Sequence, residues 1–285
     1  MDIGVMIFPT DTTIEPVELG RAAEERGFES LWFPEHSHIP SDRTTPWGGR
    51  QGAPDLPEFY WRTYDQFVAL AAVAATTERI KVGTGICLVP QRDPIWLAKE
   101  VASLDRLSGG RFLFGIGYGW NKEELAHHGV RYGDRRDRLR ESILAMRELW
   151  TQDEADYQGQ HVRFSSSWAW PKPTQQPHPP VILGGAAGPR TAAHIAEFCD
   201  GWMPIGGRHG IETGLAEIRK ACEEWGRDPA TVQLGVFGAK ADADALRDLA
   251  EMGVTRAVLG LPQGSRDDVM TALDRYADLV AVTSS

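Results

Sequence analysis

Short apolar runs alternate with amphipathic stretches along the whole chain. The runs have the length and β-branched content of buried strands, and the stretches between them repeat apolar residues at helical spacing. The pattern predicts eight strands, at residues 3–8, 30–34, 80–89, 111–117, 181–185, 202–205, 233–237 and 256–261. It predicts eight helices, at residues 15–26, 63–77, 94–107, 133–152, 189–197, 211–225, 242–252 and 267–282.

Eight successive strand and helix pairs predict an α/β protein with a (β/α)8 TIM barrel, in one domain over residues 1–285. Residues 154–180 interrupt the rhythm between the fourth helix and the fifth strand, where YQGQHVRF predicts a hairpin and WPKPTQQPHPP is too rich in proline for regular structure. The competing architecture is an open doubly wound sheet. Its GxGxxG turn is missing after the first strand, where Phe8, Pro9 and Thr10 stand instead.

The third helix carries the clearest end signals. Asp93 is a suitable N-cap and Pro94 occupies the favoured first helical position, while Ser108, Gly109 and Gly110 end the helix after Leu107. These residues predict where the chain turns back toward the fourth strand.

The charge and cysteine content of the chain limit the kinds of molecule that it is expected to bind and the compartment that it is expected to occupy. The chain of 285 residues carries a net charge of -10, which argues against general binding to nucleic acid or to anionic membranes. Three cysteines without a CxxC pair indicate reduced thiols, and the N-terminus lacks a basic leader region. With no run of 18 apolar residues, we expect a soluble cytoplasmic protein.

The second strand ends in PEHSHIP, which is the first candidate for chemistry. His36 and His38, beside Glu35, suit metal ligands, an acid/base group at a cofactor, or a solvated loop with His36 as a satisfied polar group at the barrel rim. A metal site needs further ligands from other strand ends. The fifth strand end offers glycine and alanine and the eighth offers no Asp or His, so we predict no metal.

Two other strand ends suggest a binding pocket. Glycines at 115, 117 and 119 allow close approach of a flat or bulky group after the fourth strand. Aromatic residues that could wall an apolar pocket there are Trp47, Trp61, Tyr118 and Trp120. GGAAGPRT, after the fifth strand, offers backbone N–H groups and a helix N-terminus for a phosphate, with Arg190 in the first turn. A tight glycine turn without a ligand explains the same residues.

Taken together, WFPEHSHIP, VGTGICLVPQRDP, LAKEVASLDRLSGGRFLFGIGYGWNKEEL and VILGGAAGPRT resemble the luciferase-like monooxygenase superfamily, in particular its branch that uses the deazaflavin F420. The resemblance spans essentially the whole chain in the right order. It implies a (β/α)8 barrel, a homodimer, and a cofactor ring at the C-terminal mouth of the barrel.

The resemblance also implies roles for individual residues. His36 would be the catalytic acid/base group near the reactive ring carbon, with Glu35, where many relatives carry aspartate, orienting it. Gly85-Ile86 would form a non-prolyl cis peptide behind the ring. Further cofactor-binding positions would be Leu88, Asn121, Gly184, Gly185, Ala186 and Arg190. Substrate-binding positions would be His38, Trp47, Trp61 and Trp120. Residues 43–61, rich in Gly, Pro and Trp, would form a long loop over the mouth of the barrel.

The function implied is an oxidoreductase that moves a hydride between F420 and a small, partly apolar organic substrate. Trp120 stands where a sugar-phosphate-acting relative carries a catalytic acid, so a sugar phosphate is not the expected substrate. Two alternatives stay open: a monooxygenase that uses flavin mononucleotide (FMN), and a flavin-binding or deazaflavin-binding barrel without turnover. A separate flavin or F420 reductase would supply reduced cofactor.

Overall fold

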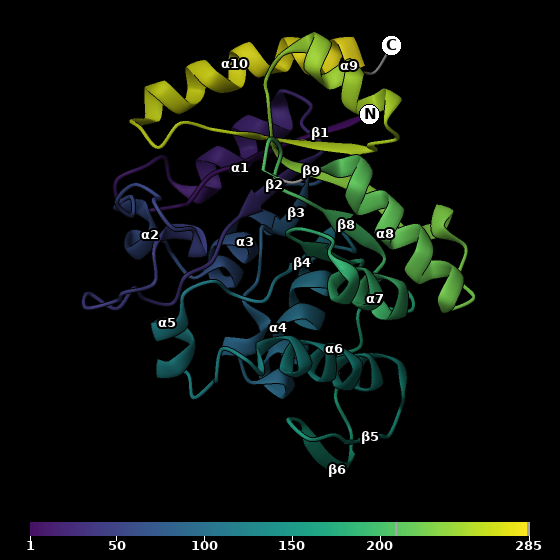
Figure 1. The fold of residues 1–285 in the computed structure, drawn as a ribbon. Coiled ribbons are helices and arrows are strands. Elements are labelled where there is room, and N and C mark those ends of the chain that lie inside the picture. Colours follow the sequence, from purple (N-terminus) through teal and green to yellow (C-terminus); the bar gives the residue numbers. More distant parts are fainter. Residues whose placement is uncertain (209, 284–285) are drawn as a thin grey trace.

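The computed structural model describes residues 1–208 and 210–283. Within that part of the chain, eight parallel strands close into a barrel in the order β1-β10-β9-β8-β7-β4-β3-β2 (Figure 1). The strands are β1 (Asp2–Met6), β2 (Ser30–Phe33), β3 (Lys81–Thr84), β4 (Phe112–Ile116), β7 (Val181–Gly184), β8 (Gly201–Met203), β9 (Gln233–Ala239) and β10 (Arg256–Gly260). The predicted (β/α)8 barrel is confirmed.

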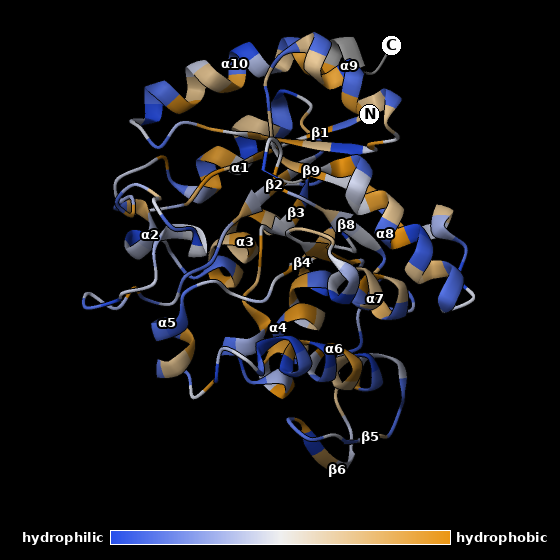
Figure 2. Ribbon diagram, in the orientation of Figure 1, coloured by the Kyte–Doolittle hydropathy of each residue, from blue (hydrophilic) through white to orange (hydrophobic). Residues whose placement is uncertain are grey.

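Helices follow the barrel strands and cover them on the outside (Figure 1). They are α1 (Pro16–Glu25), α3 (Gln66–Ala74), α4 (Pro94–Leu107), α6 (Arg135–Thr151), α7 (Pro189–Phe198), α8 (Ile211–Glu224), α9 (Ala243–Glu251) and α10 (Arg266–Thr283). Apolar and polar residues alternate along outer helices such as α8 and α10 (Figure 2), as expected for helices with one face on the barrel. No described helix is both long and apolar enough to cross a membrane.

The start of α4 follows the sequence signals. Asp93 accepts hydrogen bonds from the backbone amides of Ile95 (3.0 Å) and Trp96 (2.9 Å), and Pro94 is the first helical residue. The helix ends at Leu107, one residue before the C-cap Ser108. Both predicted ends of this helix are therefore confirmed.

The predicted excursion is an antiparallel hairpin of β5 (Ala155–Gln158) and β6 (Arg163–Ser167), set apart from the barrel strands (Figure 1). The proline-rich segment after it is held against α4 by the buried Asp105. The Asp105 carboxylate accepts from the amides of Thr174 (2.7 Å) and Gln175 (2.9 Å).

Two short helices on the C-terminal side of the barrel were not predicted, namely α2 (Phe59–Arg62) and α5 (Lys122–His127). The predicted third strand is also too long, because its pairing stops at Thr84 and a 3-10 turn follows at Val89–Gln91. Short elements lack the repeated apolar spacing on which helix prediction depends. Both differences lie at the mouth of the barrel.

Glycines in the strands make room for Trp32 inside the barrel. Trp32 is fully buried with Leu113, Ile182, Met203 and Val258. A Cβ atom on Gly83 would lie 2.4 Å from the Trp32 ring, and one on Gly115 would lie 2.0 Å from the Thr84 carbonyl oxygen. The bulky indole fits against β3 only because Gly83 carries no side chain.

A partly buried group of three charged residues joins strands at the N-terminal end of the barrel. Glu29, just before β2, accepts from Arg256 of β10 (2.7 and 3.0 Å) and from Lys81 of β3 (2.8 Å). Burial raises the pKa of the Glu29 carboxyl, but the hydrogen bonds and charge of Arg256, with Lys81, outweigh it and lower the pKa to about 2. The group therefore stays ionised in the folded protein.

We expect Glu29→Gln to lower the free energy of unfolding by about 3 kcal/mol at pH 7. Because the folded-state pKa lies below the ordinary value of 4.5, the carboxylate stabilises the fold fully above pH 4.5. This contribution is lost as the pH falls toward 2, so the difference between variant and wild type should shrink there. Urea unfolding at pH 7 and pH 3.5 measures it, with the exposed Glu251→Gln as control; equal losses in both variants would contradict the assignment.

Candidate active site

A cavity of about 630 Å³ opens at the C-terminal ends of the strands. Its walls come from the ends of β7 and β8, from β9, and from the segments that follow β1, β2, β3, β4, β7 and β8. The long loop between β2 and α2, α2 itself and the start of α6 complete the lining. The C-terminal mouth is where barrel enzymes carry their active sites. A predicted site residue can contact a bound molecule there only if its side chain reaches this cavity.

His36 reaches the cavity and is held by a carboxylate from another part of the chain. Its Nδ1 lies 2.8 Å from Oε2 of Glu124 on α5, and both residues are buried. The other Glu124 oxygen accepts from the Ser37 amide at 3.2 Å. Because a carboxylate accepts hydrogen bonds, Nδ1 carries the proton and Nε2 is left as the acceptor for a bound molecule.

Asn121 acts on this pair indirectly. It is the N-cap of α5, where its Oδ1 accepts from the Glu124 amide at 3.3 Å. The residue is fully buried and does not line the cavity. It is therefore not placed for the predicted direct contact with a cofactor. Asn121 instead fixes the first turn of the helix that presents Glu124.

Glu35 does not orient His36, which corrects the prediction. Its carboxylate accepts from the Leu88 amide (2.6 Å) and from Nε of Arg92 (2.7 Å). Arg92 also contacts Asp65 and Glu100 at 2.9 and 3.0 Å. Glu35 therefore anchors the segment after β3, and the orienting role falls to Glu124.

The segment after β3 forms the wall of the cavity. The Gly85-Ile86 peptide is cis, as the resemblance implied, and Gly85, Ile86 and Leu88 all line the cavity. Ile86 needs glycine opposite it, because a Cβ on Gly117 would lie 1.8 Å from its Cδ1 atom. A side chain on Gly184 would come within 3.0 Å of the same isoleucine. The glycines keep this wall smooth enough for a flat ring.

Aromatic rings surround His36 on the opposite side. Tyr60 and Trp120 lie 5.2 and 5.7 Å from the His36 ring, and Trp47 packs edge-on against Tyr60 at 5.8 Å. Trp47 and Trp120 line the cavity as predicted, together with Phe8 and Tyr60, which were not predicted. Trp61 is 50% exposed outside the lining, because the turn of α2 points Tyr60 inward instead.

His38 lies outside the lining, in a hydrogen-bonded group at the rim. Its Nε2 is 2.8 Å from Nδ1 of His127, and its Nδ1 is 3.0 Å from the Ser37 hydroxyl. The same hydroxyl is 2.7 Å from Nε2 of His128. His38 thus contacts α5 and does not reach a substrate in this arrangement.

Four arginines also line the cavity, and none of these four was predicted. The lining includes Arg50, Arg135, Arg136 and Arg208, and no carboxylate among the described residues forms an ion pair with any of them. Arg135 stacks on Tyr132, with its guanidinium carbon 3.5 Å from the ring centre. Its Nε atom is buried and has no hydrogen-bond partner among the described residues.

Of the residues predicted to hold the cofactor tail, Gly184, Gly185 and Ala186 line the cavity, whereas Arg190 does not. The Arg190 guanidinium forms an ion pair with Asp137 of the neighbouring helix α6, which holds it outside the lining. Sequence position predicted Arg190 because it follows the glycines. The arginines of the cavity come from segments far apart in the chain, and no motif next to them in the sequence predicts that they meet there.

Tyr118 lines the cavity with a hydroxyl that points to a buried histidine. The hydroxyl oxygen is 2.9 Å from Nδ1 of His194 on α7. Burial lowers the pKa of His194 to about 4 and raises the pKa of Tyr118 to about 12. Both groups are therefore neutral at pH 7, and the positive charge of the cavity comes from the arginines.

Comparison with known proteins agrees with this geometry. The family model for luciferase-like monooxygenases matches residues 3–280. The chain belongs to the luciferase-like monooxygenase family. An uncharacterised protein from Mycobacterium tuberculosis is 42% identical over 283 residues, which is 99% of both chains.

Two further proteins similar to this chain carry descriptive names. An F420-dependent hydroxymycolic acid dehydrogenase from Mycobacterium tuberculosis is 30% identical over 237 residues, covering 81% of this chain and 60% of that one. The structure of an F420-dependent tetrahydromethanopterin reductase from Methanopyrus kandleri matches with a TM-score of 0.77 at 18% identity, over 100% and 99% of the two chains. The latter likeness shows that the two proteins share the luciferase-like barrel.

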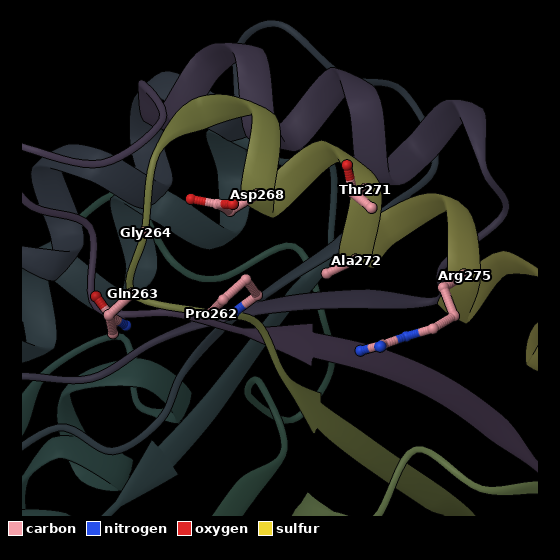
Figure 3. Close-up of a pocket in the computed structure, with 7 residues that line it drawn as sticks. All are labelled: Pro262, Gln263, Gly264, Asp268, Thr271, Ala272 and Arg275. Atoms are coloured by element: carbon pink, nitrogen blue, oxygen red, sulfur yellow. The ribbon is translucent and has the colours of Figure 1, made fainter.

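A second cavity, of about 370 Å³, lies between the turn after β10 and α10 (Figure 3). It holds one carboxylate, Asp268, and one guanidinium, Arg275, and none of the predicted site residues. Among the described residues, no three His, Cys, Asp or Glu side chains are placed to hold a metal ion. In this luciferase-like barrel, the predicted site residues that reach a cavity therefore line the larger one, around His36.

Proposed function

We propose that the protein is an F420-dependent oxidoreductase that transfers a hydride between the deazaflavin and a small, partly apolar organic substrate, an alcohol or the corresponding carbonyl compound. The observation that carries the proposal is His36, oriented by Glu124 and facing a cavity that is lined by both aromatic side chains and arginines. The 30% identical relative named as an F420-dependent dehydrogenase supports the choice of cofactor.

The residues of the cavity fit F420. A phosphate-bearing tail needs cationic donors, and Arg135 offers a buried Nε without a partner among the described residues. Gly184 and Gly185 lie on the cavity wall, where backbone N–H groups suit a phosphate. A flat ring fits against Ile86, whose glycine neighbours leave the wall free of side chains.

When bound, F420 supplies hydride chemistry and does not activate oxygen well. The chain supplies the proton chemistry. His36 accepts the hydroxyl proton at Nε2 as the alcohol is oxidised, or donates one as a carbonyl is reduced, and Glu124 keeps the ring in the required tautomer. Trp47, Tyr60 and Trp120 exclude water from this side and favour an apolar substrate body.

The test is a fluorescence titration of the purified protein with F420 and with FMN, followed by anaerobic turnover with F420 and a panel of 2-propanol, 2-hexanol and cyclohexanol. Saturable binding of F420 and oxygen-independent reduction of the cofactor are the expected results. Preference for FMN with oxygen consumption would favour a two-component monooxygenase. Binding of F420 without turnover across the panel would favour a binding protein.

Arg135→Ala is expected to weaken F420 binding about tenfold, which corresponds to about 1.4 kcal/mol, because a charge-assisted bond to the tail is lost. Arg190→Ala is the matched control. Its guanidinium is already paired with Asp137, so its removal should leave the dissociation constant unchanged. Titration of both variants measures the difference, and equal weakening would show that the tail does not bind at Arg135.

We infer the oligomeric state and the cellular compartment from exposed apolar side chains and from the cysteines. The apolar side chains of Val68 and Trp96, 71% and 70% exposed on α3 and α4, support a homodimer through this face. Three buried free cysteines support a reducing cytoplasm. We take residues 1–285 as one domain, and we expect a separate F420 or flavin reductase to regenerate the cofactor.

A further inference from the structure

Glu123, the residue before Glu124, holds a different part of the site. Its Oε1 accepts three hydrogen bonds from one segment of the long loop: the Thr44 amide at 2.9 Å, the Thr44 hydroxyl at 2.9 Å and the Thr45 amide at 3.2 Å. Its Oε2 is buried and has no hydrogen-bond partner among the described residues. The attachment of this segment to α5 therefore rests on a single carboxylate oxygen.

The attached segment, residues 43–50, is called the strap. It lies over the mouth and brings Trp47 and Arg50 to the cavity. Arg43 at its start lies over the Trp120 ring, 5.9 Å from the ring centre. Further along, a Cβ on Gly48 would lie 3.7 Å from the Arg208 guanidinium, so the strap reaches the turn after β8.

The strap completes the aromatic lining of the cavity. Trp47 packs edge-on against Tyr60, which in turn lies 5.2 Å from His36. Removing the attachment at Thr44 and Thr45 would free Trp47 without touching His36 or its partner Glu124. The two adjacent glutamates thus support separate parts of the site from one short helix.

The charge of Glu123 suits this task. Burial raises the pKa of its carboxyl, but hydrogen bonds from Thr45 and Thr44 outweigh burial and lower the pKa to about 2. Other titratable groups near the strap and α5 are Glu124, Arg43 and Arg208, with Tyr60 beneath Trp47. The attachment should therefore persist throughout the physiological pH range.

We propose that Glu123 is the positioning residue of the substrate subsite: by fastening the strap at Thr44 and Thr45, it places Trp47 against the apolar substrate, whereas Glu124 serves the chemical step. The expected change in kinetics rests on the proposed function. The expected loosening of the strap does not, because it can be measured without cofactor or substrate.

Hydrogen exchange followed by mass spectrometry tests the structural part. Peptides that contain the Thr44 and Thr45 amides should exchange about tenfold faster in Glu123→Ala than in wild type, because both amides lose their acceptor. Thr44→Val, which removes only the hydroxyl bond, should give a smaller increase. Glu224→Ala, an exposed glutamate of α8, is the control and should leave exchange at the strap unchanged.

Steady-state kinetics with F420 and cyclohexanol test the functional part. In Glu123→Ala, KM for cyclohexanol should rise about fivefold to tenfold while kcat stays within about twofold, since binding is lost and the chemical step is not. The effects of Glu123→Ala and Thr44→Val should fall short of additivity in the double variant, because they remove the same contact.

Unchanged exchange at the strap in Glu123→Ala would overturn the proposal, and so would faster exchange with an unchanged KM. A fall in kcat equal to the change in kcat/KM would also overturn it, because Glu123 would then act on the chemical step. If wild-type protein neither binds F420 nor oxidises alcohols, the proposed function fails, and hydrogen exchange still decides whether Glu123 fastens the strap.

Discussion

Replacing His36 by alanine should lower kcat for F420-dependent alcohol oxidation by about 10³-fold, the size expected for loss of a positioned proton acceptor. The physical reason is that Nε2 of His36 is the ring nitrogen left for a substrate, since Nδ1 donates to Glu124. The dissociation constant for F420 should stay close to the wild-type value, because the arginines and glycines proposed to hold the cofactor are untouched.

Stopped-flow measurement of cofactor reduction under anaerobic conditions measures the loss, and a fluorescence titration measures F420 binding. His161→Ala, outside the cavity lining, is the control and should match wild type in both. Added imidazole should restore part of the activity of His36→Ala if the missing group is a proton acceptor. Unchanged turnover in the variant would remove His36 from the mechanism.

Glu124→Gln should lower kcat by about 10²-fold with little change in F420 affinity. The amide cannot serve both neighbours, because His36 Nδ1 and the Ser37 amide each need an acceptor. If the amide NH₂ faces His36, the ring adopts the opposite tautomer, and its Nε2 then carries a proton and cannot accept another. If it faces Ser37, a buried amide N–H loses its partner.

Each arrangement also costs stability: the first forces the less suitable tautomer on a buried imidazole, and the second leaves the Ser37 amide facing another donor. We expect the free energy of unfolding to fall by about 1–3 kcal/mol, measured by urea unfolding at pH 7. Glu224→Gln is the matched control, since its carboxylate is exposed on α8. A Glu124→Gln enzyme with full kcat would show that His36 needs no orienting carboxylate.

The variants of the two adjacent glutamates can therefore be compared directly with each other. Glu123 contacts the strap and Glu124 contacts His36, although the two are neighbours on the same helical turn. The first is expected to change KM and the second kcat. Reversal of this pattern would contradict both assignments together.

The sequence by itself determined the barrel and several walls of the site. Alternation of apolar runs and amphipathic stretches is a local property, so it predicts strands and helices without knowledge of contacts. His36 and the Gly184-Gly185 turn follow strands directly, and the C-terminal ends of parallel strands meet at one mouth. The cis peptide at Gly85-Ile86 was accessible only through the family resemblance.

Only the tertiary structure decided the partners of these residues. Glu35 was expected to orient His36 because it is adjacent in sequence. Both residues line the cavity, but adjacency in the chain does not by itself bring two side chains into contact. Glu35 instead meets Arg92, while the carboxylate that meets His36 comes from 88 residues away. Such a contact depends on how two strand ends are brought together.

The arginines of the cavity also come together only in the folded barrel. Arg50, Arg135 and Arg208 come from a loop, a helix and a turn that the closed barrel places around one mouth. Arg190, predicted from its position after a glycine turn, is instead neutralised by Asp137 across a helix interface. Local pattern predicts which elements form, whereas the pairing of charges depends on distances that only the folded barrel sets.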